Sequence, residues 1–257
     1  MSKNIATSTS GLISRMNSNS KNEFKNYDEW IKELLISHIS PPKECLDIGC
    51  GVGKQTILIH NLYPFSNITS VDKSQKSLDT ISDLVPSSRI NLICSDIDDF
   101  QNYCTKKYDL IISSYAFYYS KNMVDLLIKY SESLKKDGMI LLLGYSKRSN
   151  LEIINVINQS NTKKISFYKD FLSLEELDLL KEHFLIDVSY FDNKIGFNSL
   201  SDFQQWFETS ELLSKSENLD QLLREISNFI QKNGAFLVTK ETLSIVLKKK
   251  PVVMTCP

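Results

Sequence analysis

The sequence has no excess of basic residues and no long apolar run, and each of these absences argues against one class of function. Its 257 residues hold 30 Lys and Arg against 31 Asp and Glu, a formal net charge of −1. Nucleic-acid binders usually carry a basic excess that neutralises phosphates, so a polynucleotide partner is disfavoured, with a local basic patch left open. No apolar run approaches the roughly 18–20 residues of a membrane helix, so we expect no membrane association.

The N-terminal residues 1–20 lack the apolar segment of a secretory signal and are rich in Ser and Asn. Lys3 and Arg15 precede the first acid, Glu23, which gives a weak similarity to a transit peptide. We expect instead a flexible polar tail over residues 1–20. One domain is then expected over residues 21–257.

The sequence contains five cysteines, an odd number, and no C-x-x-C pair. Cys45 and Cys94 fall in apolar, strand-like runs and are predicted to be small core residues. This usage suits a reducing compartment, so we expect a cytoplasmic protein. No metal site is predicted.

Short apolar segments alternate with amphipathic ones from residue 44 to residue 144. This alternation predicts an α/β fold, a doubly wound parallel sheet with helices on both faces. Expected strands are 44–48, 68–71, 91–94, 110–113, 139–144, 186–191 and 243–247. Expected helices are 23–40, 54–62, 75–84, 124–134, 151–159, 174–184, 199–209 and 220–231. In such sheets, ligands bind beyond the carboxyl ends of the strands.

Glycines at positions 49, 51 and 53 follow the first expected strand and open a helix. A dinucleotide loop reads G-x-G-x-x-G, and its third glycine would fall at position 54, which is Lys54. Asp47, just before the loop, would repel a pyrophosphate but suits a cofactor that carries an ammonium and a sulfonium cation. The loop therefore favours such a cofactor over a dinucleotide.

Two further acids end the next expected strands. Asp72 can accept hydrogen bonds from both hydroxyls of a ribose. Asp96 can accept from an exocyclic adenine amine, with the backbone N–H of Ile97 nearby for a ring nitrogen. Alone, each acid could equally be a surface carboxylate or a helix cap.

Residues 45–53 resemble the first motif of the class I S-adenosylmethionine-dependent methyltransferases. Asp72 matches the family's ribose-binding acid, and residues 95–97 match its adenine-contacting segment. Residues 108–114 and 134–141 are similar to later motifs, so the resemblance covers residues 22–145. It implies S-adenosylmethionine as cofactor, with these binding residues: Asp47, Gly49, Cys50, Gly51, Gly53, Asp72, Lys73, Asp96, Ile97 and Ser113.

The resemblance also implies a Rossmann-like, seven-stranded, mostly parallel sheet whose last two strands form a reversed hairpin. Residues 186–191 and 243–247 are the candidates for that hairpin. The expected domain divides into a cofactor-binding core over 40–148 and a helical region with the late strands over 149–242. The helical insertion is expected to cap the methyl acceptor.

Many small-molecule members carry a His a few residues after the Ser113-Ser114 pair, where this chain has Tyr118. We therefore take Tyr118 and Tyr115 as candidate catalytic residues, with core packing as the alternative. Tyr119, Phe197 and Trp206 are the candidate acceptor-binding residues. The three His, at positions 38, 60 and 183, are expected on helices beside the sheet, as structural residues.

The shortage of His favours an acceptor that needs little deprotonation, such as a carboxylate, or a Tyr or Asp as base. The segment 195–207 is loosely similar to the trans-aconitate and juvenile-hormone-acid methyltransferases, which esterify carboxylates. We therefore expect transfer of a methyl group to an oxygen of a small molecule, a carboxylate or a hydroxyl.

Methylation of nitrogen or carbon remains an alternative, as does a non-catalytic methyltransferase-like partner. A nucleic-acid amino-methyltransferase is disfavoured because residues 113–116 lack the two prolines of its motif. The oligomeric state stays open.

Overall fold

The computed structural model describes residues 8–102 and 104–250, which divide into two compact units. The sheet unit comprises residues 31–144, 170–189 and 243–250, and the helical unit comprises residues 8–30, 145–169 and 190–242. Each unit therefore draws on three separate stretches of the chain.

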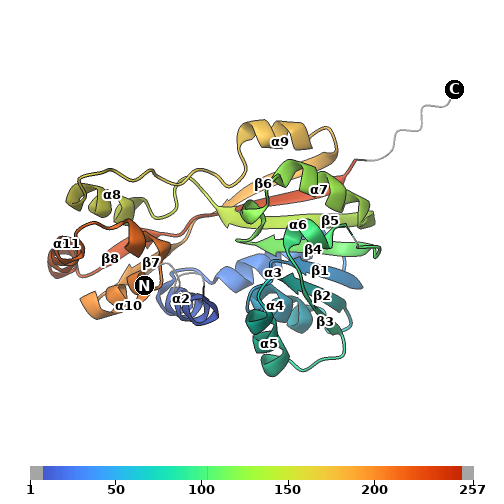
Figure 1. Ribbon diagram of the computed structural model, residues 1–257, viewed down its shortest axis with the longest axis horizontal. Helices are drawn as coiled ribbons and strands as arrows, with labels where there is room; N and C mark the ends of the chain where they lie inside the picture. Colours follow the sequence, from blue (N-terminus) through green and yellow to red (C-terminus); the bar gives the residue numbers. More distant parts are fainter. Residues whose placement is uncertain (1–7, 103, 251–257) are drawn as a thin grey trace. The chain divides into compact units, whose positions relative to one another are not determined.

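A seven-stranded sheet forms the centre of the sheet unit, in the order β3-β2-β1-β4-β5-β9-β6 (Figure 1). The pairs β1–β2, β1–β4, β2–β3 and β4–β5 are parallel, and the last two strands form an antiparallel hairpin. This confirms the predicted fold class and both hairpin strands. The strands are β1 (Glu44–Ile48), β2 (Asn67–Asp72), β3 (Ile90–Cys94), β4 (Tyr108–Ser114), β5 (Leu134–Tyr145), β6 (Phe184–Phe191) and β9 (Thr242–Lys249).

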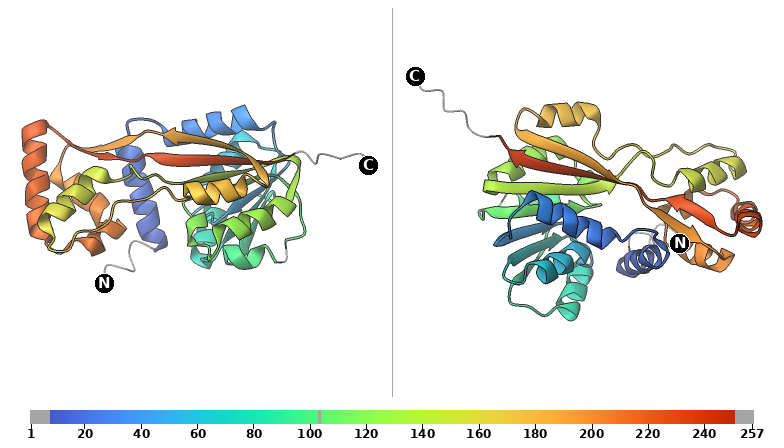
Figure 2. Two further views of the ribbon diagram at one scale, coloured as in Figure 1. Left: turned by 90° about the horizontal axis from the view of Figure 1, so that it is seen from above. Right: turned by 180° about the vertical axis from the view of Figure 1, so that it is seen from behind.

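Helices cover both faces of this sheet, with α3, α4 and α5 on one face and α6, α7 and α9 on the other (Figures 1 and 2). The central strands β1 and β4 are buried almost throughout, as expected for strands between two helical layers. The helices are α3 (Tyr27–His38), α4 (Lys54–Leu62), α5 (Gln75–Leu84), α6 (Ile97–Phe100), α7 (Met123–Glu132) and α9 (Leu174–Leu180).

The helical unit has its own hydrophobic core, built on Phe197, Phe203, Trp206 and Phe236. A two-stranded antiparallel sheet and four helices surround it, two of which lie between β6 and β9 as predicted for the insertion. Its elements are α2 (Thr9–Asn22), α8 (Leu151–Ser160), β7 (Lys194–Phe197), α10 (Leu200–Glu208), η2 (Glu211–Lys215), α11 (Leu219–Asn233) and β8 (Phe236–Thr239).

The N-terminal segment differs from the predicted polar tail, because residues 9–22 form helix α2. The Ser8 side chain caps its first turn by accepting a hydrogen bond from the Gly11 N–H at 3.1 Å. Asn19 of this helix accepts a hydrogen bond from the Trp206 indole at 3.0 Å. These contacts place α2 in the helical unit, and residues 1–7 of the predicted tail, with Lys3, lie outside the described residues.

The boundaries of other elements shift in ways that the sheet explains. Helix α9 ends at Leu180 rather than residue 184, because Phe184 begins β6. Strand β5 begins at Leu134, since its first residue pairs with Tyr108 across an irregular register. Cys94, predicted to be a core residue, is exposed because β3 is an edge strand, whereas Cys45 is buried as predicted.

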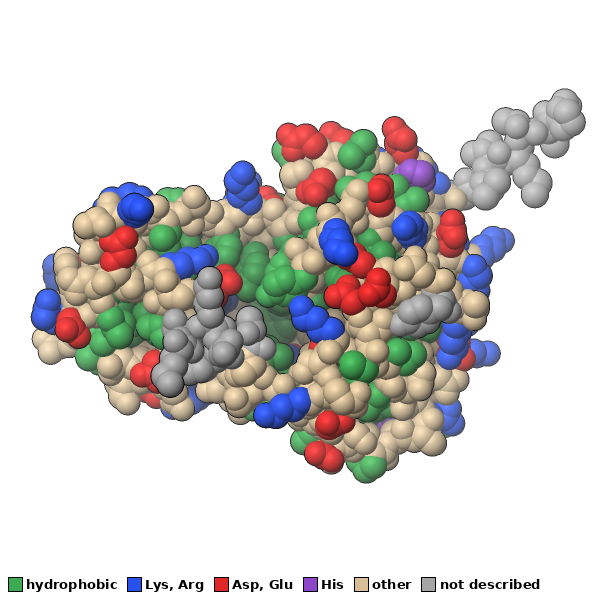
Figure 3. All heavy atoms as spheres, viewed as in Figure 1, with side chains coloured by type: hydrophobic (Ala, Val, Ile, Leu, Met, Phe, Trp, Pro, Cys, Tyr) green, Lys and Arg blue, Asp and Glu red, His purple; other side chains and the backbone are tan. Residues whose placement is uncertain are grey.

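The sheet unit includes α9, β6 and β9 besides residues 31–144, and the cofactor-binding core over 40–148 stays a prediction. Within the described ranges, none of the helices has the length and apolarity needed to cross a bilayer. Lys and Arg are interspersed with Asp and Glu on the face seen in Figure 3.

Candidate functional site

The Gly-rich loop joins β1 to α4 through three left-handed glycines. Gly49, Gly51 and Gly53 have φ angles of 68°, 54° and 86°, a region that side chains disfavour. The N–H groups of Gly49 and Cys50 both donate to the Val71 carbonyl, at 2.8 and 3.0 Å. These bonds hold the loop across the end of β2 and set the first turn of α4 beside it.

The residues that follow β1 and β4 approach each other so closely at Gly49 that a side chain there would clash. A Cβ at this position would lie 2.2 Å from Ala116 Cβ and 4.0 Å from Ile97 Cγ2. Ser113 contributes to the same approach, because its buried hydroxyl donates to the Ile48 carbonyl at 2.8 Å. Ser113, predicted as a cofactor ligand, thus fastens β4 to β1, and Ala116 is a contact that the sequence analysis missed.

Asp47 lies beneath the loop with 1% of its surface exposed. Its Oδ2 accepts a hydrogen bond of 2.7 Å from Thr56 Oγ1, and that hydroxyl also lies 2.8 Å from Ser70 Oγ. Burial is the main cause that raises the pKa of Asp47 to about 7, with the Asp72 charge adding to it. Oδ1 has no hydrogen-bond partner among the described residues, so it can accept a bond from a polar group at the loop.

Asp72 ends β2 with its carboxylate held by two backbone N–H groups. Oδ2 accepts from Gly51 and Oδ1 accepts from Ser74, both at 2.8 Å. Each oxygen keeps a further lone pair, so the side chain can still accept hydrogen bonds from a diol. Lys73 follows, with its Nζ 5.8 Å from the ring centroid of Tyr119.

The end of β3 brings Asp96 and Ile97 to the same edge. Asp96 caps the short helix α6 by accepting from the Asp98 N–H at 3.0 Å. Ile97 approaches Gly49, and its carbonyl accepts a hydrogen bond of 3.1 Å from the Tyr130 hydroxyl. The carboxyl ends of β1, β2 and β3 therefore converge, and they present three acids and a left-handed loop at one edge.

The tyrosines after β4 take three different positions. Tyr115 has a φ of 54°, a strained conformation for a non-glycine residue, and its N–H donates to the Leu143 carbonyl at 2.7 Å. Tyr118 packs partly on the sheet-unit core, and its ring centroid lies 4.7 Å from that of Tyr119. Tyr119 is 67% exposed.

The histidines lie elsewhere in the sheet unit. His38 ends α3, where its ring nitrogens lie 2.9 Å from the Leu34 carbonyl and 3.0 Å from Asp187. His60 belongs to α4, and His183 lies between α9 and β6. No group of three or more possible metal ligands is found among residues 8–102 and 104–250.

Phe197 and Trp206, the two predicted acceptor-binding residues of the helical unit, lie in its hydrophobic core. They are 0% and 1% exposed and pack on each other in the core of the helical unit, with ring centroids 5.2 Å apart. Apolar periodicity predicts that such residues are buried, but it cannot distinguish a core from the wall of a cavity.

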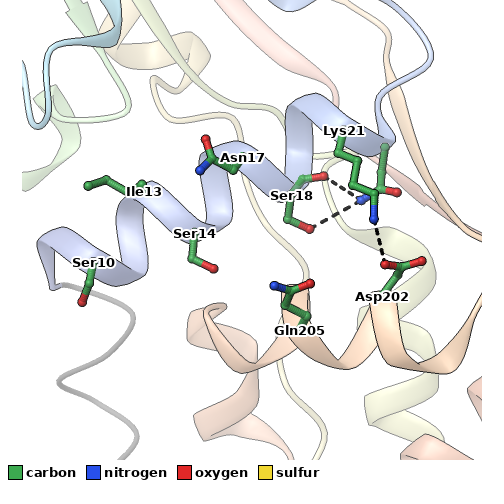
Figure 4. Close-up of a pocket in the computed structure, with 9 residues that line it drawn as sticks. Ser10, Ile13, Ser14, Asn17, Ser18, Lys21, Asp202 and Gln205 are labelled. Atoms are coloured by element: carbon green, nitrogen blue, oxygen red, sulfur yellow. Dashed lines mark hydrogen bonds and ion pairs between the residues drawn. The ribbon is translucent and has the colours of Figure 1, made fainter. Parts of the chain in front are cut away.

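A polar hollow of about 420 Å³ lies in the helical unit between α2 and α10 (Figure 4). An ion pair of 3.0 Å joins Lys21 Nζ on α2 to Asp202 Oδ1 on α10 at this hollow. None of the strand-end residues described above lines this hollow. Its lining residues are Ser10, Ile13, Ser14, Asn17, Ser18, Lys21, Asn22, Asp202 and Gln205.

The sequence matches a known protein family over the first five strands of the sheet. The model of the family described as "Methyltransferase domain" matches residues 46–142. The chain is 31% identical to malonyl-[acyl-carrier protein] O-methyltransferase 2 of Ilyobacter polytropus, over 63% of this chain and 66% of that one. It is 28% identical to the malonyl-[acyl-carrier protein] O-methyltransferase of Priestia megaterium, over 62% of this chain and 59% of that one.

The alignments thus span about three fifths to two thirds of the length of these two relatives. Among solved structures, the YcgJ protein from Bacillus subtilis superposes with a TM-score of 0.57 at 13% identity, over 87% of this chain and 98% of that one. Together with the converging strand ends, these similarities support a class I S-adenosylmethionine-dependent methyltransferase, the family that the sequence motifs resemble.

Proposed function

We propose that this chain binds S-adenosylmethionine at the carboxyl ends of β1, β2 and β3 and methylates a carboxylate oxygen of an acidic small molecule. The convergence of the glycine loop with Asp72 and Asp96 carries the first half of this proposal. The names of the relatives support the second half, because both methylate an oxygen of a malonyl group.

Within this site, the residues take distinct roles toward the cofactor. Asp72 accepts hydrogen bonds from the ribose hydroxyls, and its two backbone contacts hold it in place. Asp96 and the Ile97 N–H contact the adenine. The unpartnered Oδ1 of Asp47 accepts from a polar group that reaches beneath the loop. Gly49, Cys50, Gly51 and Gly53 provide the backbone surface, and Lys73 lies at its rim.

When bound, the cofactor supplies an electrophilic methyl group on a sulfonium. A carboxylate acceptor is already ionised at neutral pH, so this chain needs no general base for it. What the protein supplies is alignment of the acceptor and exclusion of water. We propose that Tyr115 and Tyr118 do this, with Tyr119 at the outer edge of the acceptor site.

A relative's name includes an acyl carrier protein, so we extend the acceptor class to an acid presented on such a carrier as well as a free acid. We also propose the cytoplasm as the compartment, because Cys45 and Cys50 are buried free thiols.

Calorimetric titration with S-adenosylmethionine tests the cofactor site. We expect Asp72→Ala to weaken binding by about tenfold or more, since two charge-assisted contacts to the ribose are lost. Asp79→Ala is the matched control, because Asp79 is an exposed carboxylate of α5 that bonds Gln75. Absence of binding by the folded wild-type chain would refute the proposal.

The acceptor is tested by incubation with methyl-labelled cofactor and a panel of acids, free and carrier-bound. A label released by mild base identifies a methyl ester, as proposed. A base-stable product would instead indicate methylation of nitrogen or carbon. Cofactor binding without turnover on any acceptor of a cell extract would indicate a non-catalytic methyltransferase-like protein.

A further inference from the structure

Lys240 is a half-buried lysine of the helical unit that the proposed methyl transfer does not use. It lies between β8 and β9, and its ammonium sits 4.7 Å from the ring centroid of Trp206. It donates one hydrogen bond, of 2.7 Å, to Asn150 Oδ1. These two are its side-chain partners within the part of the chain that the structure describes.

The carboxylates whose charges act on Lys240 are held by other donors. Both oxygens of Glu152 accept from Thr239, its N–H at 2.8 Å and its hydroxyl at 2.6 Å. Glu211 accepts a hydrogen bond of 2.6 Å from the Tyr168 hydroxyl. Both acids thus accept hydrogen bonds from other residues, and the Lys240 ammonium donates to Asn150 instead.

The next residue, Glu241, is engaged in the same way. It is 3% exposed, and its two oxygens lie 2.7 Å from Ser146 Oγ and 3.0 Å from an Arg148 nitrogen. An ammonium has three N–H donors, and Lys240 uses one of them. Lys240 is thus a cation over an aromatic ring that makes no ion-pair contact with a carboxylate among residues 8–102 and 104–250, although two carboxylates act on it from farther away.

The electrostatics agree with this geometry. Removal from water, followed by the positive charge of Arg15 on α2, lowers the pKa of Lys240 to about 7. The charges of Glu211 on η2 and Glu152 on α8 oppose that shift without cancelling it. An anion at the ammonium would favour the protonated form and raise this pKa.

We propose that Lys240, held by Asn150 over the face of Trp206, forms a binding site for an oxyanion, either a carboxylate or a phosphate ester. The proposal goes beyond the proposed methyl transfer, because this site uses none of the strand-end residues proposed to hold the cofactor. Lys240 donates the hydrogen bonds and the charge, and Asn150 orients the amine.

Competitive acetylation of lysines, read by peptide mass spectrometry, tests the site. Because the neutral amine reacts, a one-unit rise in pKa slows labelling of Lys240 near pH 7 by roughly fivefold. We expect that protection from malonate if the site takes a carboxylate, and from inorganic phosphate if it takes a phosphate ester. Lys215, which lies over Tyr168 in the same unit, is the internal control. Unchanged labelling of Lys240, or equal protection of Lys215, would overturn the proposal.

Variants provide a second, independent measurement. Affinity of the wild type for the protecting anion should fall by up to about tenfold per pH unit between the pKa of free Lys240, about 7, and the higher pKa of the complex, and should level off above the latter. Lys240→Arg should keep the binding and lose this pH dependence, because its guanidinium stays charged. Lys240→Gln should weaken binding by about tenfold or more. Wild-type affinity in Lys240→Gln would refute the assignment.

Both measurements are made without S-adenosylmethionine. Failure to find the oxyanion site would therefore not count against the proposed methyl transfer. Conversely, a protein that fails to bind the cofactor could still bind an oxyanion at Lys240.

Discussion

Replacement of Gly49 by alanine should combine two separable costs at the strand-end site. The left-handed φ of 68° costs a side-chain-bearing residue about 1–2 kcal/mol. The new Cβ would lie 2.2 Å from Ala116 Cβ, and relief of such overpacking costs about 1–3 kcal/mol more. We therefore expect Gly49→Ala to lower the free energy of unfolding by about 2–5 kcal/mol.

Gly234→Ala is the matched control for the conformational part. Gly234 ends α11 with a φ of 81°, and a Cβ there would meet nothing within 4 Å. Its replacement should cost only the conformational term of about 1–2 kcal/mol. The difference between the two variants measures the contact with Ala116.

A rescue variant completes the experiment. In Gly49→Ala/Ala116→Gly, the nearest atom to the new Cβ becomes the Cα of residue 116, at an ordinary 3.7 Å. We expect the double variant to recover the steric part in urea denaturation, and with it the affinity for S-adenosylmethionine. The reasoning is wrong if Gly49→Ala costs no more than Gly234→Ala, or if the second substitution restores nothing.

Three further predictions concern buried charges and the strained tyrosine. The pKa of Asp47 is raised in the folded protein, so the folded state binds this proton more tightly than the unfolded state does. The free energy of unfolding should therefore fall as pH rises from about 4 to 7, by up to roughly 1.4 kcal/mol per pH unit. Asp47→Asn should flatten that slope in denaturant unfolding at several pH values; an unchanged slope would contradict it. Glu241→Ala should cost about 1–3 kcal/mol in the same assay, since it leaves the buried Ser146 hydroxyl without this acceptor. As a control, Asp178→Ala removes an exposed ion pair with Lys181 and should cost less than about 0.5 kcal/mol. Equal losses in the two variants would count against an effect of burial. Tyr115→Gly should relieve the left-handed strain at φ 54° yet slow methyl transfer if its ring aligns the acceptor, as measured by turnover with labelled cofactor; a fully active variant would remove Tyr115 from the site.

The parts of the fold that the sequence predicts are those in which a local pattern and a global requirement coincide. Strands β1 and β4 are buried because helices cover both sides of the sheet, and their short, mainly apolar segments 44–48 and 110–113 can be recognised without tertiary information. The glycines of the loop are equally informative, because only their φ angles permit its path.

Predictions failed where the decisive contact is distant in sequence. Helix α2 is Ser- and Asn-rich, and its place is set by residues nearly 190 positions away, as in the Asn19–Trp206 hydrogen bond. The cap at Ser8 was a local signal that could have indicated it. Strands β7 and β8 are four residues each, too short for an alternating pattern to stand out.

The site residues divide in the same way. The positions of Asp72 and Asp96 at strand ends follow from topology, whereas their partners, such as Gly51 N–H for Asp72, require coordinates. The sequence alone does not reveal that Trp206 is buried, because a large aromatic residue suits a hydrophobic core and a ligand pocket equally well.

The order of strands in the sheet has a consequence for synthesis on the ribosome. Strand β9 lies between β5 and β6, although some fifty residues of the helical unit separate β6 from it along the chain. A nascent chain that has emerged as far as β6 therefore lacks β9, the strand beside β6 in the sheet, which has not yet been translated. We expect β6 to be the segment most exposed to aggregation and to chaperones until residue 249 leaves the exit tunnel.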